Sequence, residues 1–366
     1  MRRGNSKKKR MAVIVLAFCL ALGLTGCGQA VSVEPVQTAG QTAAIQGQAL
    51  AEVHFLDVGQ GDSIFLRLGD KTMLIDAAEA DQAEKIIAYL QSQQVEKLDY
   101  VLGTHPHADH IGGLAQVIRA FDVGQVYLPK VSHNTATYRK LLETIQQKGL
   151  KVHTAKAGVK VLEENGITAE ILSPPENWEG DLNNQSIVMK LTAGEVSYLF
   201  TGDAETEVEK MLTDVRADVL KVGHHGSSTS SSAMFLQRVQ PKIAVISCGV
   251  NNDYGHPHKE TLSALEKVGA TVYRTDEDGT VVVSTDGKAL SVRTEKKGEL
   301  PMDTTGEKPV PTQAAANDPG RTVYITKTGE RYHADGCEGL KNSKIQTTIQ
   351  QAEKDGYTPH KACMGE

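Results

Sequence analysis

Three histidines and one aspartate lie within six consecutive positions and together could bind metal ions. They are His105, His107, Asp109 and His110, and the apolar run 98–103 before them is typical of a β-strand. A turn after that strand would place alternate side chains on one side, so His105 and His107 can share one cation while Asp109 and His110 hold a second. Mixed nitrogen and oxygen ligands suit Zn²⁺ or Mn²⁺ rather than Ca²⁺, and two such ions lower the pKa of a water between them. A solvated cluster of surface histidines is the alternative, which this density of ligand side chains disfavours.

Alternating strands and helices must position these side chains. Short runs rich in β-branched residues predict strands, and apolar residues at helical spacing predict helices. The predicted strands are 53–58, 63–68, 72–76, 99–103, 196–201, 218–222 and 242–247, and the predicted helices are 82–93, 112–120, 137–148, 204–213, 232–239 and 259–267. This alternation implies sheets covered by helices, in an α/β (α+β) fold.

Further segments, taken with the histidine-rich one, resemble the hydrolase domain of the ComEC/Rec2 competence-protein family, which has the metallo-β-lactamase fold. Those segments are 53–63, 183–186, 200–203, 220–227 and 254–258. The resemblance covers about residues 51–295. It implies an αββα sandwich and a dinuclear metallohydrolase that cleaves phosphodiesters, with DNA as the leading substrate.

The resemblance also implies roles for individual residues. Asp203 would bridge the two metals, although an aspartate before a helix is also a common N-cap. Either His224 or His225 could be a further ligand; His225 is preferred, which places His224 beside the substrate. The implied metal ligands are thus His105, His107, Asp109, His110, Asp203 and His225. The implied catalytic residues are Asp109, Asp203, His224 and His256, where His224 and His256 stabilise developing negative charge or protonate the leaving group.

Six other polar residues are candidates for supporting the metals or the substrate: Asp57, Asp62, Asp76, Asn184, Ser186 and Ser227. Asp57 and Asp62 flank a glycine-rich turn that lies beside the metals in the family, and Asp76 ends a strand where it could orient a ligand histidine. Plain turn-forming and strand-capping roles are the alternatives. The segment 183–186 stands where lactamase-like hydrolases have a further histidine, so an asparagine or a water is expected to complete the shell. Ser227 begins a serine-rich loop that could meet a substrate anion or simply be flexible.

The first 26 residues are typical of a lipoprotein signal peptide. Residues 1–10 contain six Lys or Arg and no acid, 11–23 are nearly all apolar, and 24–27 resemble a lipobox that ends at Cys27. The apolar stretch is short for a membrane span, although a retained anchor helix is the alternative. We therefore expect a lipid on Cys27, a flexible tether over 27–50, and a location at the extracellular face of the bacterial cytoplasmic membrane.

Charge limits the ways in which the mature chain could bind nucleic acid. Loss of residues 1–26 removes six of the 39 basic residues and none of the 45 acidic ones, which leaves a formal charge of −12. This disfavours a large electrostatic surface for nucleic acid. It does not exclude an enzyme that meets phosphate through bound cations, since these reverse the local field.

The C-terminal part of the chain predicts a linker and a second, small module. Residues 296–320 are rich in Lys, Glu, Thr, Pro and Gly, and residues 321–366 contain a strand at 322–326 and a helix near 349–353. A unit of this size needs a staple, and four possible ligands for a structural zinc are His333, Cys337, His360 and Cys363. The unit resembles tail modules of secreted bacterial hydrolases that have Cys-x₂-Cys, with His360 in place of the first Cys. A Cys337–Cys363 disulfide is the alternative.

Two other functions remain compatible with these patterns. The enzyme could act on teichoic acid or another phosphodiester of the cell surface rather than on DNA. The chain could also be a surface binding protein without catalysis, which the full set of candidate ligands argues against. No protein partner can be inferred from the sequence.

Overall fold

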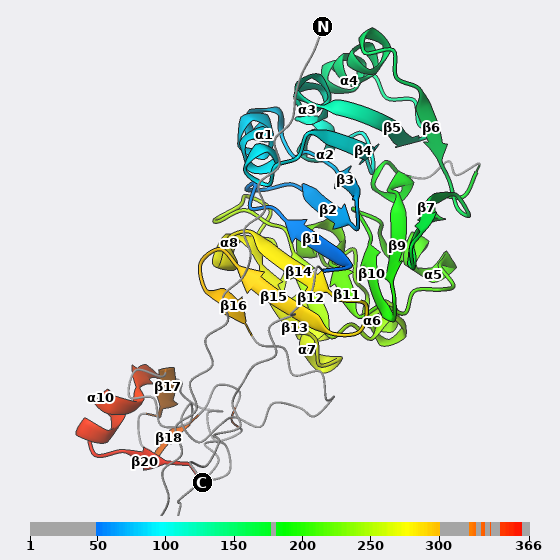
Figure 1. The fold of residues 1–366 in the computed structure, drawn as a ribbon. Helices are drawn as coiled ribbons and strands as arrows, with labels where there is room; N and C mark the ends of the chain where they lie inside the picture. The colour runs from blue at the N-terminus through cyan, green and yellow to red at the C-terminus, as the bar shows by residue number, and fades with distance from the viewer. Residues whose placement is uncertain are drawn as a thin grey trace, which may run out of the picture. The chain divides into compact units, whose positions relative to one another are not determined.

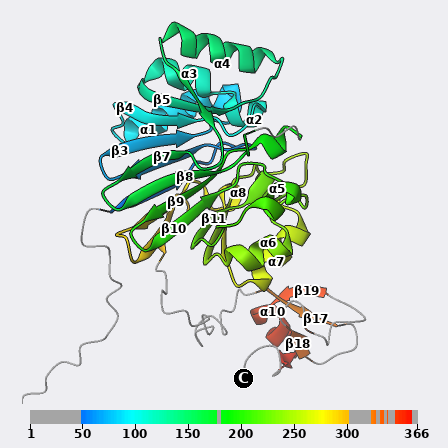
Figure 2. The same ribbon diagram turned by 90° about the vertical axis from the view of Figure 1, so that its right-hand side faces the viewer.

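The computed structural model describes residues 49–176, 181–300, 322–326, 331–333, 337 and 345–360. Within 49–300 two β-sheets pack face to face, and helices cover both outer faces (Figures 1 and 2). This confirms the expected αββα arrangement. The predicted signal peptide, Cys27, most of the tether, residues 301–320 of the predicted linker and Cys363 lie outside the described residues.

The first sheet has nine strands in the order β16-β15-β14-β1-β2-β3-β4-β5-β6. Their bounds are β1 Ala51–Phe55, β2 Ile64–Leu68, β3 Lys71–Ile75, β4 Lys97–Leu102, β5 Asp122–Pro129, β6 Val152–Ala155, β14 Val281–Thr285, β15 Leu290–Thr294 and β16 Gly298–Leu300. Strand β16 extends this sheet five residues beyond position 295, into the start of the predicted linker.

The second sheet has seven strands in the order β13-β12-β11-β10-β9-β8-β7. Their bounds are β7 Lys160–Glu164, β8 Ile167–Ser173, β9 Val188–Ala193, β10 Val196–Phe200, β11 Val219–Lys221, β12 Ile243–Ile246 and β13 Thr271–Arg274. Strand β8 shows why such segments pair: its side chains alternate between buried and partly exposed along the whole strand, as a sheet with one buried face requires.

The helices form the two outer layers. Their bounds are α1 Ala83–Ser92, α2 Ala108–Ile111, α3 Leu114–Ala120, α4 Ala136–Gln147, α5 Thr206–Met211, α6 Ala233–Val239, α7 Lys259–Lys267 and α8 Thr275–Asp278, with short 3₁₀ helices at η1 Ala80–Gln82, η2 Asn183–Gln185 and η3 Gly223–Gly226. One apolar cluster joins α1, α3 and α4 to the first sheet, and another joins α5, α6 and α7 to the second. Helix α4 illustrates the local rules: Thr135 caps its N-terminus through Tyr138 N, and Leu141 and Ile145 face the core four residues apart.

Side chains from both sheets form the central core. Phe55 and Val53 of β1 pack in one cluster with Tyr198 and Phe200 of β10, and all four are almost fully buried. This apolar layer fixes the distance between the sheets, so loops that leave the same edge of both sheets are held at a constant separation.

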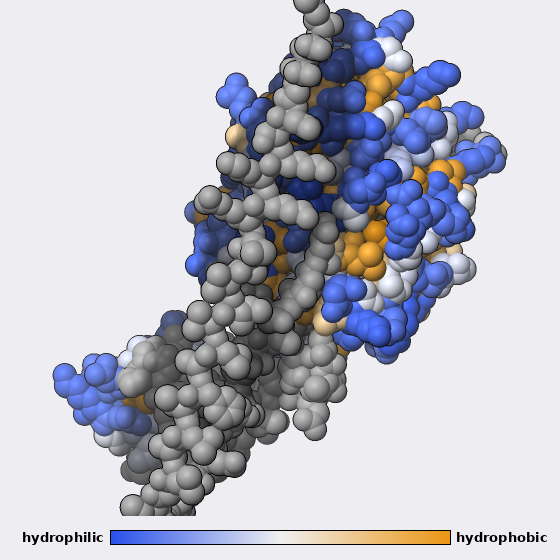
Figure 3. Space-filling model, viewed as in Figure 1, coloured by the Kyte–Doolittle hydropathy of each residue, from blue (hydrophilic) through white to orange (hydrophobic). Residues whose placement is uncertain are grey.

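The described surface carries both polar and apolar side chains. On the face shown in Figure 3, hydrophilic side chains surround scattered apolar patches. Exposed large apolar side chains include Met234, Val250 and Tyr254. No helix within the described part of the chain has the length and apolar character of a membrane span.

The C-terminal module contains a four-stranded sheet in the order β19-β17-β18-β20 and one helix. The bounds are β17 Thr322–Ile325, β18 Arg331–His333, β19 Ile345–Thr348, α10 Ile349–Lys354 and β20 Thr358–Pro359. Its apolar cluster has only four buried members among the described residues, namely Val323, Tyr332, Ile349 and Ala352.

Candidate metal centre

The candidate ligands follow the ends of strands in both sheets. Strands β3 and β4 are parallel in the first sheet, and β10, β11 and β12 are parallel in the second, so within each sheet these strands end at one edge. Asp76 follows β3, the segment 105–110 follows β4, Asp203 follows β10, and His225 follows β11. The two sheets thus contribute to one group of side chains.

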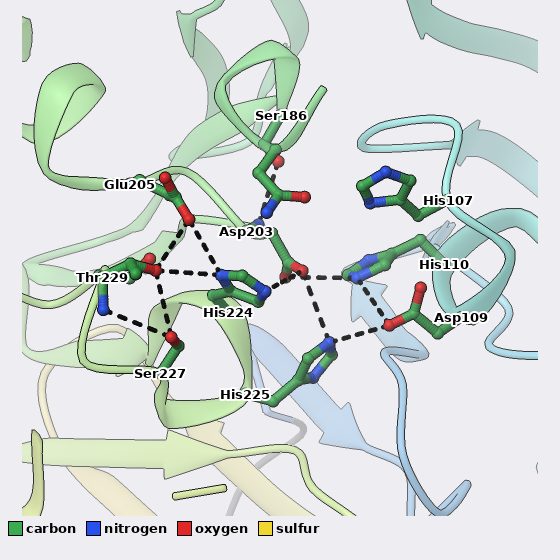
Figure 4. A network of polar contacts seen from close by, with 12 residues as sticks. His107, Asp109, His110, Ser186, Asp203, Glu205, His224, His225, Ser227 and Thr229 are labelled. Carbon is green, nitrogen blue, oxygen red and sulfur yellow. Dashed lines mark hydrogen bonds and ion pairs between the residues drawn. The ribbon is translucent and has the colours of Figure 1, made fainter. Parts of the chain in front are cut away.

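Four of the predicted ligands form a tight cluster around one point. Asp109, His110, Asp203 and His225 each have a ligand atom within 4.8 Å of the others. The Nε2 atom of His110 lies 3.2 Å from Asp203 Oδ1, and Nε2 of His225 lies 3.3 Å from Asp109 Oδ2. Figure 4 shows the side chains of His110 and His225 pointing at Asp203, which lies at the centre of the network.

The other two predicted ligands lie beside this cluster. Nε2 of His105 is 2.9 Å from Nδ1 of His107 and 3.9 Å from Asp203 Oδ2. Oδ1 of Asp203 lies nearest His110, whereas Oδ2 lies 3.6 Å from Nε2 of His225 and 3.9 Å from Nε2 of His105, so the carboxylate stands between the two groups of ligands. This placement is the one that a carboxylate shared by two cations needs.

The cluster fits divalent cations by its unsatisfied atoms and by its charge. The buried atoms His110 Nε2, His225 Nε2 and Asp203 Oδ1 have no partner with hydrogen-bond geometry, a costly arrangement unless a ligand is bound. Four carboxylates lie between 2.8 and 3.9 Å from the ring nitrogens of His110: Asp62, Asp76, Asp109 and Asp203. Among their described ion pairs, the only Lys or Arg partner is Lys221.

The pKa shifts of two ligand histidines run in opposite directions, and each is compatible with metal binding. Burial holds the pKa of His105 well below its usual range, so this ring is neutral and can ligate a metal. Burial would also lower the pKa of His110, but Asp203 and Asp76 outweigh it and raise that pKa well above the usual range. A cation that binds His110 therefore takes the place of a proton.

Outer hydrogen bonds orient the ligand histidines. Asp76 is completely buried, and its carboxylate accepts hydrogen bonds from Thr104 N at 2.7 Å and from His110 Nδ1 at 2.8 Å. Likewise, Nδ1 of His225 donates to the carbonyl oxygen of Ser247 at 3.0 Å. These bonds leave Nε2 of both rings free to face the cluster. For His110 this is the geometry that an orienting role of Asp76 requires.

The glycine-rich turn packs directly beneath the loop of Asp109. The amide of Asp62 donates to Asp109 O at 3.0 Å, and a Cβ at Gly61 would lie 2.5 Å from that same oxygen. Gly61 also has a φ of +142°, so the turn needs glycine for its conformation as well. Asp57 takes a different part: its carboxylate accepts from Gly59 N at 3.4 Å within the turn.

The segment 183–186 holds the loop of Asp203 in place. Ser186 Oγ accepts from Asp203 N at 3.0 Å, and Asn184 Oδ1 accepts from Glu205 N at 2.9 Å. Asn184 is buried and contacts the backbone of the loop of Asp203, which is where a supporting residue would lie. Asn183 lines the cleft.

The centre opens into a cleft of about 340 Å³. Its lining includes Asp109, Asp203, His224, His225 and His256. Gln60 and Tyr254 also line it; both lie in segments that resemble the family, but the sequence analysis assigned neither of them a role. Ser227 lies outside this lining and contacts Thr229 Oγ1 at 3.1 Å.

The two catalytic histidine candidates differ from the buried ligands. His224 lies outside the four-residue cluster, with Nε2 3.6 Å from Asp203 Oδ2 and Nδ1 3.4 Å from Glu205 Oε1. Burial, with His225 and His224 nearby, lowers the pKa of His256 to about 4. His256 is therefore neutral at pH 7 and suits N–H donation to a phosphoryl oxygen better than transfer of a proton to a leaving group.

One supporting residue has no signal of its own in the sequence. Lys221 at the end of β11 is almost fully buried, and its Nζ lies 2.6 Å from Asp62 Oδ2. Asp62 in turn has Oδ1 3.6 Å from His225 Nδ1. The buried ammonium group of Lys221 thus offsets part of the negative charge of the carboxylates around the centre.

Comparison with known proteins identifies the family. The model for the Metallo-beta-lactamase superfamily matches residues 56–250. The chain is 33% identical over 252 residues to ComE operon protein 3 of Bacillus subtilis (strain 168), covering 63% of this chain and 32% of that protein. It is 31% identical over 235 residues to Competence protein ComA of Neisseria gonorrhoeae, covering 63% and 31%. It is 31% identical over 240 residues to Recombination protein 2 of Haemophilus influenzae, covering 64% and 29%.

These relatives are longer proteins, and the chain spans about a third of their length. The resemblance to the ComEC/Rec2 competence proteins expected from the sequence motifs is confirmed by them. The family match covers more than half of the chain and includes every candidate ligand from His105 to His225. The chain therefore belongs to the metallo-beta-lactamase superfamily, as a metal-dependent hydrolase.

Proposed function

We propose that this chain is a dinuclear phosphodiesterase that hydrolyses DNA outside the cell. One observation supports this most directly: two neighbouring groups of candidate ligands share Asp203 and open into a cleft whose lining includes His224 and His256. With cations bound, a cleft lined by imidazole N–H groups would suit an electrophile that carries negative charge, such as a phosphodiester. Relatives named for competence and recombination favour nucleic acid as the source of that phosphodiester.

In this proposal some residues bind the two cations and others bind the substrate. His105 and His107 with Asp203 would hold one cation, and Asp109, His110, Asp203 and His225 would hold the second. When bound, such ions supply a nucleophile from water at neutral pH and polarise the phosphoryl group. His224 and the neutral His256 would donate hydrogen bonds to the phosphoryl oxygens, where charge develops as the nucleophile attacks. Zn²⁺ and Mn²⁺ both suit this mixture of imidazole and carboxylate.

The proposed location depends on the sequence of the first 50 residues. A basic start, an apolar stretch and a lipobox at Cys27 favour export and lipid attachment. The following tether would hold the enzyme at the outer face of the cytoplasmic membrane. At that place the centre would meet extracellular DNA, and phosphodiesters of the cell wall are the competing substrates.

The test compares substrates and variants of the purified chain. Hydrolysis of bis-p-nitrophenyl phosphate, single-stranded DNA and double-stranded DNA is measured with Mn²⁺ or Zn²⁺, beside metal-free protein. Loss of an outer-shell partner of a metal ligand alone costs about 10- to 100-fold. Asp203→Asn, which removes a shared ligand, is expected to cost more than that while circular dichroism remains unchanged. Asp70→Asn, at an exposed hairpin turn, is the matched control and should retain full activity.

The outcomes separate the candidate functions. Metal-dependent DNA cleavage that Asp203→Asn abolishes would support the proposal. Cleavage of the small ester without cleavage of DNA would contradict DNA as the substrate and favour teichoic acid or a similar polymer. No turnover with any metal, together with binding of DNA or cell wall, would favour a non-catalytic surface protein.

A further inference from the structure

The strand pairing of the C-terminal module brings two histidines together. Strands β18 and β20 run parallel, with Tyr332 opposite Pro359. His333 is the next residue on one strand and His360 the next on the other, and His360 N donates to Tyr332 O at 3.0 Å. The two imidazole rings consequently lie with their centroids 4.5 Å apart.

A free thiol completes the group. Cys337 follows His333 by four residues, is not in a disulfide, and is partly exposed. Its Sγ lies 3.2 Å from Nδ1 of His333 and 3.6 Å from Nδ1 of His360. Ligand atoms of all three residues lie within 4.8 Å of one another.

These distances, which also allow hydrogen bonds of the thiol, match the separation of ligand atoms around a tetrahedral zinc ion. Zinc binds sulfur at about 2.3 Å and imidazole nitrogen at about 2.0 Å, and at a tetrahedral angle those bonds separate the two ligand atoms by about 3.5 Å. Both observed sulfur–nitrogen distances lie within about 0.3 Å of that value. The two histidines would ligate through Nδ1, and Cys337 as a thiolate.

The small core of the module indicates that a bound metal would contribute to its stability. Four buried residues form its apolar cluster among the described residues. A unit of about 45 residues rarely gains enough stability from burial alone. A metal that joins the ends of β18 and β20 would add the missing stabilisation, because a site of this kind does not exist in the unfolded chain.

We propose that His333, Cys337 and His360 bind one structural zinc ion that folds the C-terminal module. This site is separate from the dinuclear centre and does not depend on the proposed catalytic function. Cys363, expected from the sequence as a fourth ligand, lies outside the described residues, and the proposal rests on the other three. On binding, Cys337 releases its thiol proton to water and no oxidation takes place.

Cobalt substitution of the full chain tests the site with a readout that the catalytic centre cannot produce. The candidate ligands of the dinuclear centre contain no sulfur, so a thiolate-to-Co²⁺ charge-transfer absorption would report on Cys337. We expect this absorption in the wild-type chain and its loss in Cys337→Ser. Cys248→Ser is the matched control: that thiol is buried in the hydrolase domain near Asp276, and the absorption should remain.

A second variant keeps the proposal testable if Cys337→Ser unfolds the module. His360→Cys replaces one zinc ligand by another and should retain one tightly held zinc, with a stronger thiolate absorption after cobalt substitution. Zinc analysis should show one ion per chain fewer in Cys337→Ser, with hydrolysis by the dinuclear centre retained. Absence of thiolate absorption in the wild type, an unchanged spectrum in Cys337→Ser, or a Cys337–Cys363 disulfide detected by mass spectrometry without reduction would each overturn the proposal.

Discussion

The buried pair of Lys221 and Asp62 offers the sharpest test of how the core supports the metal centre. Both side chains are almost completely removed from water, and their charged atoms are 2.6 Å apart. With an effective dielectric constant of about 20, the attraction at this distance is ~6 kcal/mol, which the loss of hydration of both ions partly offsets. Lys221→Met leaves the carboxylate of Asp62 buried without its partner. We expect this variant to lower the free energy of unfolding by about 3–5 kcal/mol.

Urea unfolding of metal-free protein, followed by circular dichroism, measures this loss without a contribution from bound metal. A double-mutant cycle with Asp62→Asn isolates the pair: the double variant should be more stable than the sum of the single effects predicts, with a coupling energy of about 1–3 kcal/mol. Lys190→Met is the matched control. Lys190 lies 2.7 Å from Asp214, whose side chain is 72% exposed, so its loss should cost at most about 1 kcal/mol.

Two results would refute this reasoning. A loss below about 1 kcal/mol in Lys221→Met would mean that the pair is no stronger than one at the surface. Additive effects in the cycle would mean that Lys221 and Asp62 act on stability independently, and that the short distance between them has no energetic meaning.

Three other predictions follow from the loops and strands around the centre. Gly61→Ala should lose metal and activity, because its Cβ would meet Asp109 O at 2.5 Å, whereas Gly59→Ala meets no atom within 4 Å and should lose less; metal analysis compares them. Tyr254→Ala should raise KM for single-stranded DNA about 5- to 100-fold, because this exposed aromatic lines the cleft, stacks on His256 on one side and can stack on a base on the other; an unchanged KM would exclude stacking on a base. Asp218 has a lowered pKa: burial opposes the shift, but bonds from Ser197 and Lys242 outweigh it. The ionised Asp218 therefore stabilises the fold above the unfolded pKa of about 4, and this stabilisation is lost as pH falls through the folded pKa. The difference in free energy of unfolding between wild type and Asp218→Ala, about 1–3 kcal/mol at pH 7, should shrink toward pH 3 in urea titrations. A difference that does not change with pH would contradict the cause given.

Much of the fold could be predicted because the pattern of apolar residues is local. Helices α1, α4, α6 and α7 and strands β1 to β4 lie where the spacing of buried side chains placed them. Strands β5 to β9 and β13 to β16 were not predicted. Strand β8 alternates clearly and could have been recognised, but β6 is an edge strand with three exposed residues, so its sequence has no buried face to show.

The candidate site was predictable where its residues are neighbours in sequence. The segment 105–110 is recognisable as a metal-binding segment because its ligand residues are close in sequence. Asp76 and Asp203 are recognisable as candidate site residues because each follows the end of a predicted strand. Pairings between distant elements gave no such signal. Nothing in β11 shows that Lys221 meets Asp62, and only the loop geometry decides that Asn183 rather than Asn184 lines the cleft.

The division of the candidate ligands between the two sheets couples catalysis to the integrity of the sandwich. His105 and His110 follow strands of the first sheet, and Asp203 and His225 follow strands of the second. A bound ion would therefore cross-link the two sheets. Metal affinity and adhesion of the two sheets then share one thermodynamic cycle, in which each strengthens the other by the same amount. Removal of a methyl group from the core between β1 and β10, far from any ligand, would consequently lower the affinity for metal. Removal of the metal by a chelator would in turn lower the free energy of unfolding.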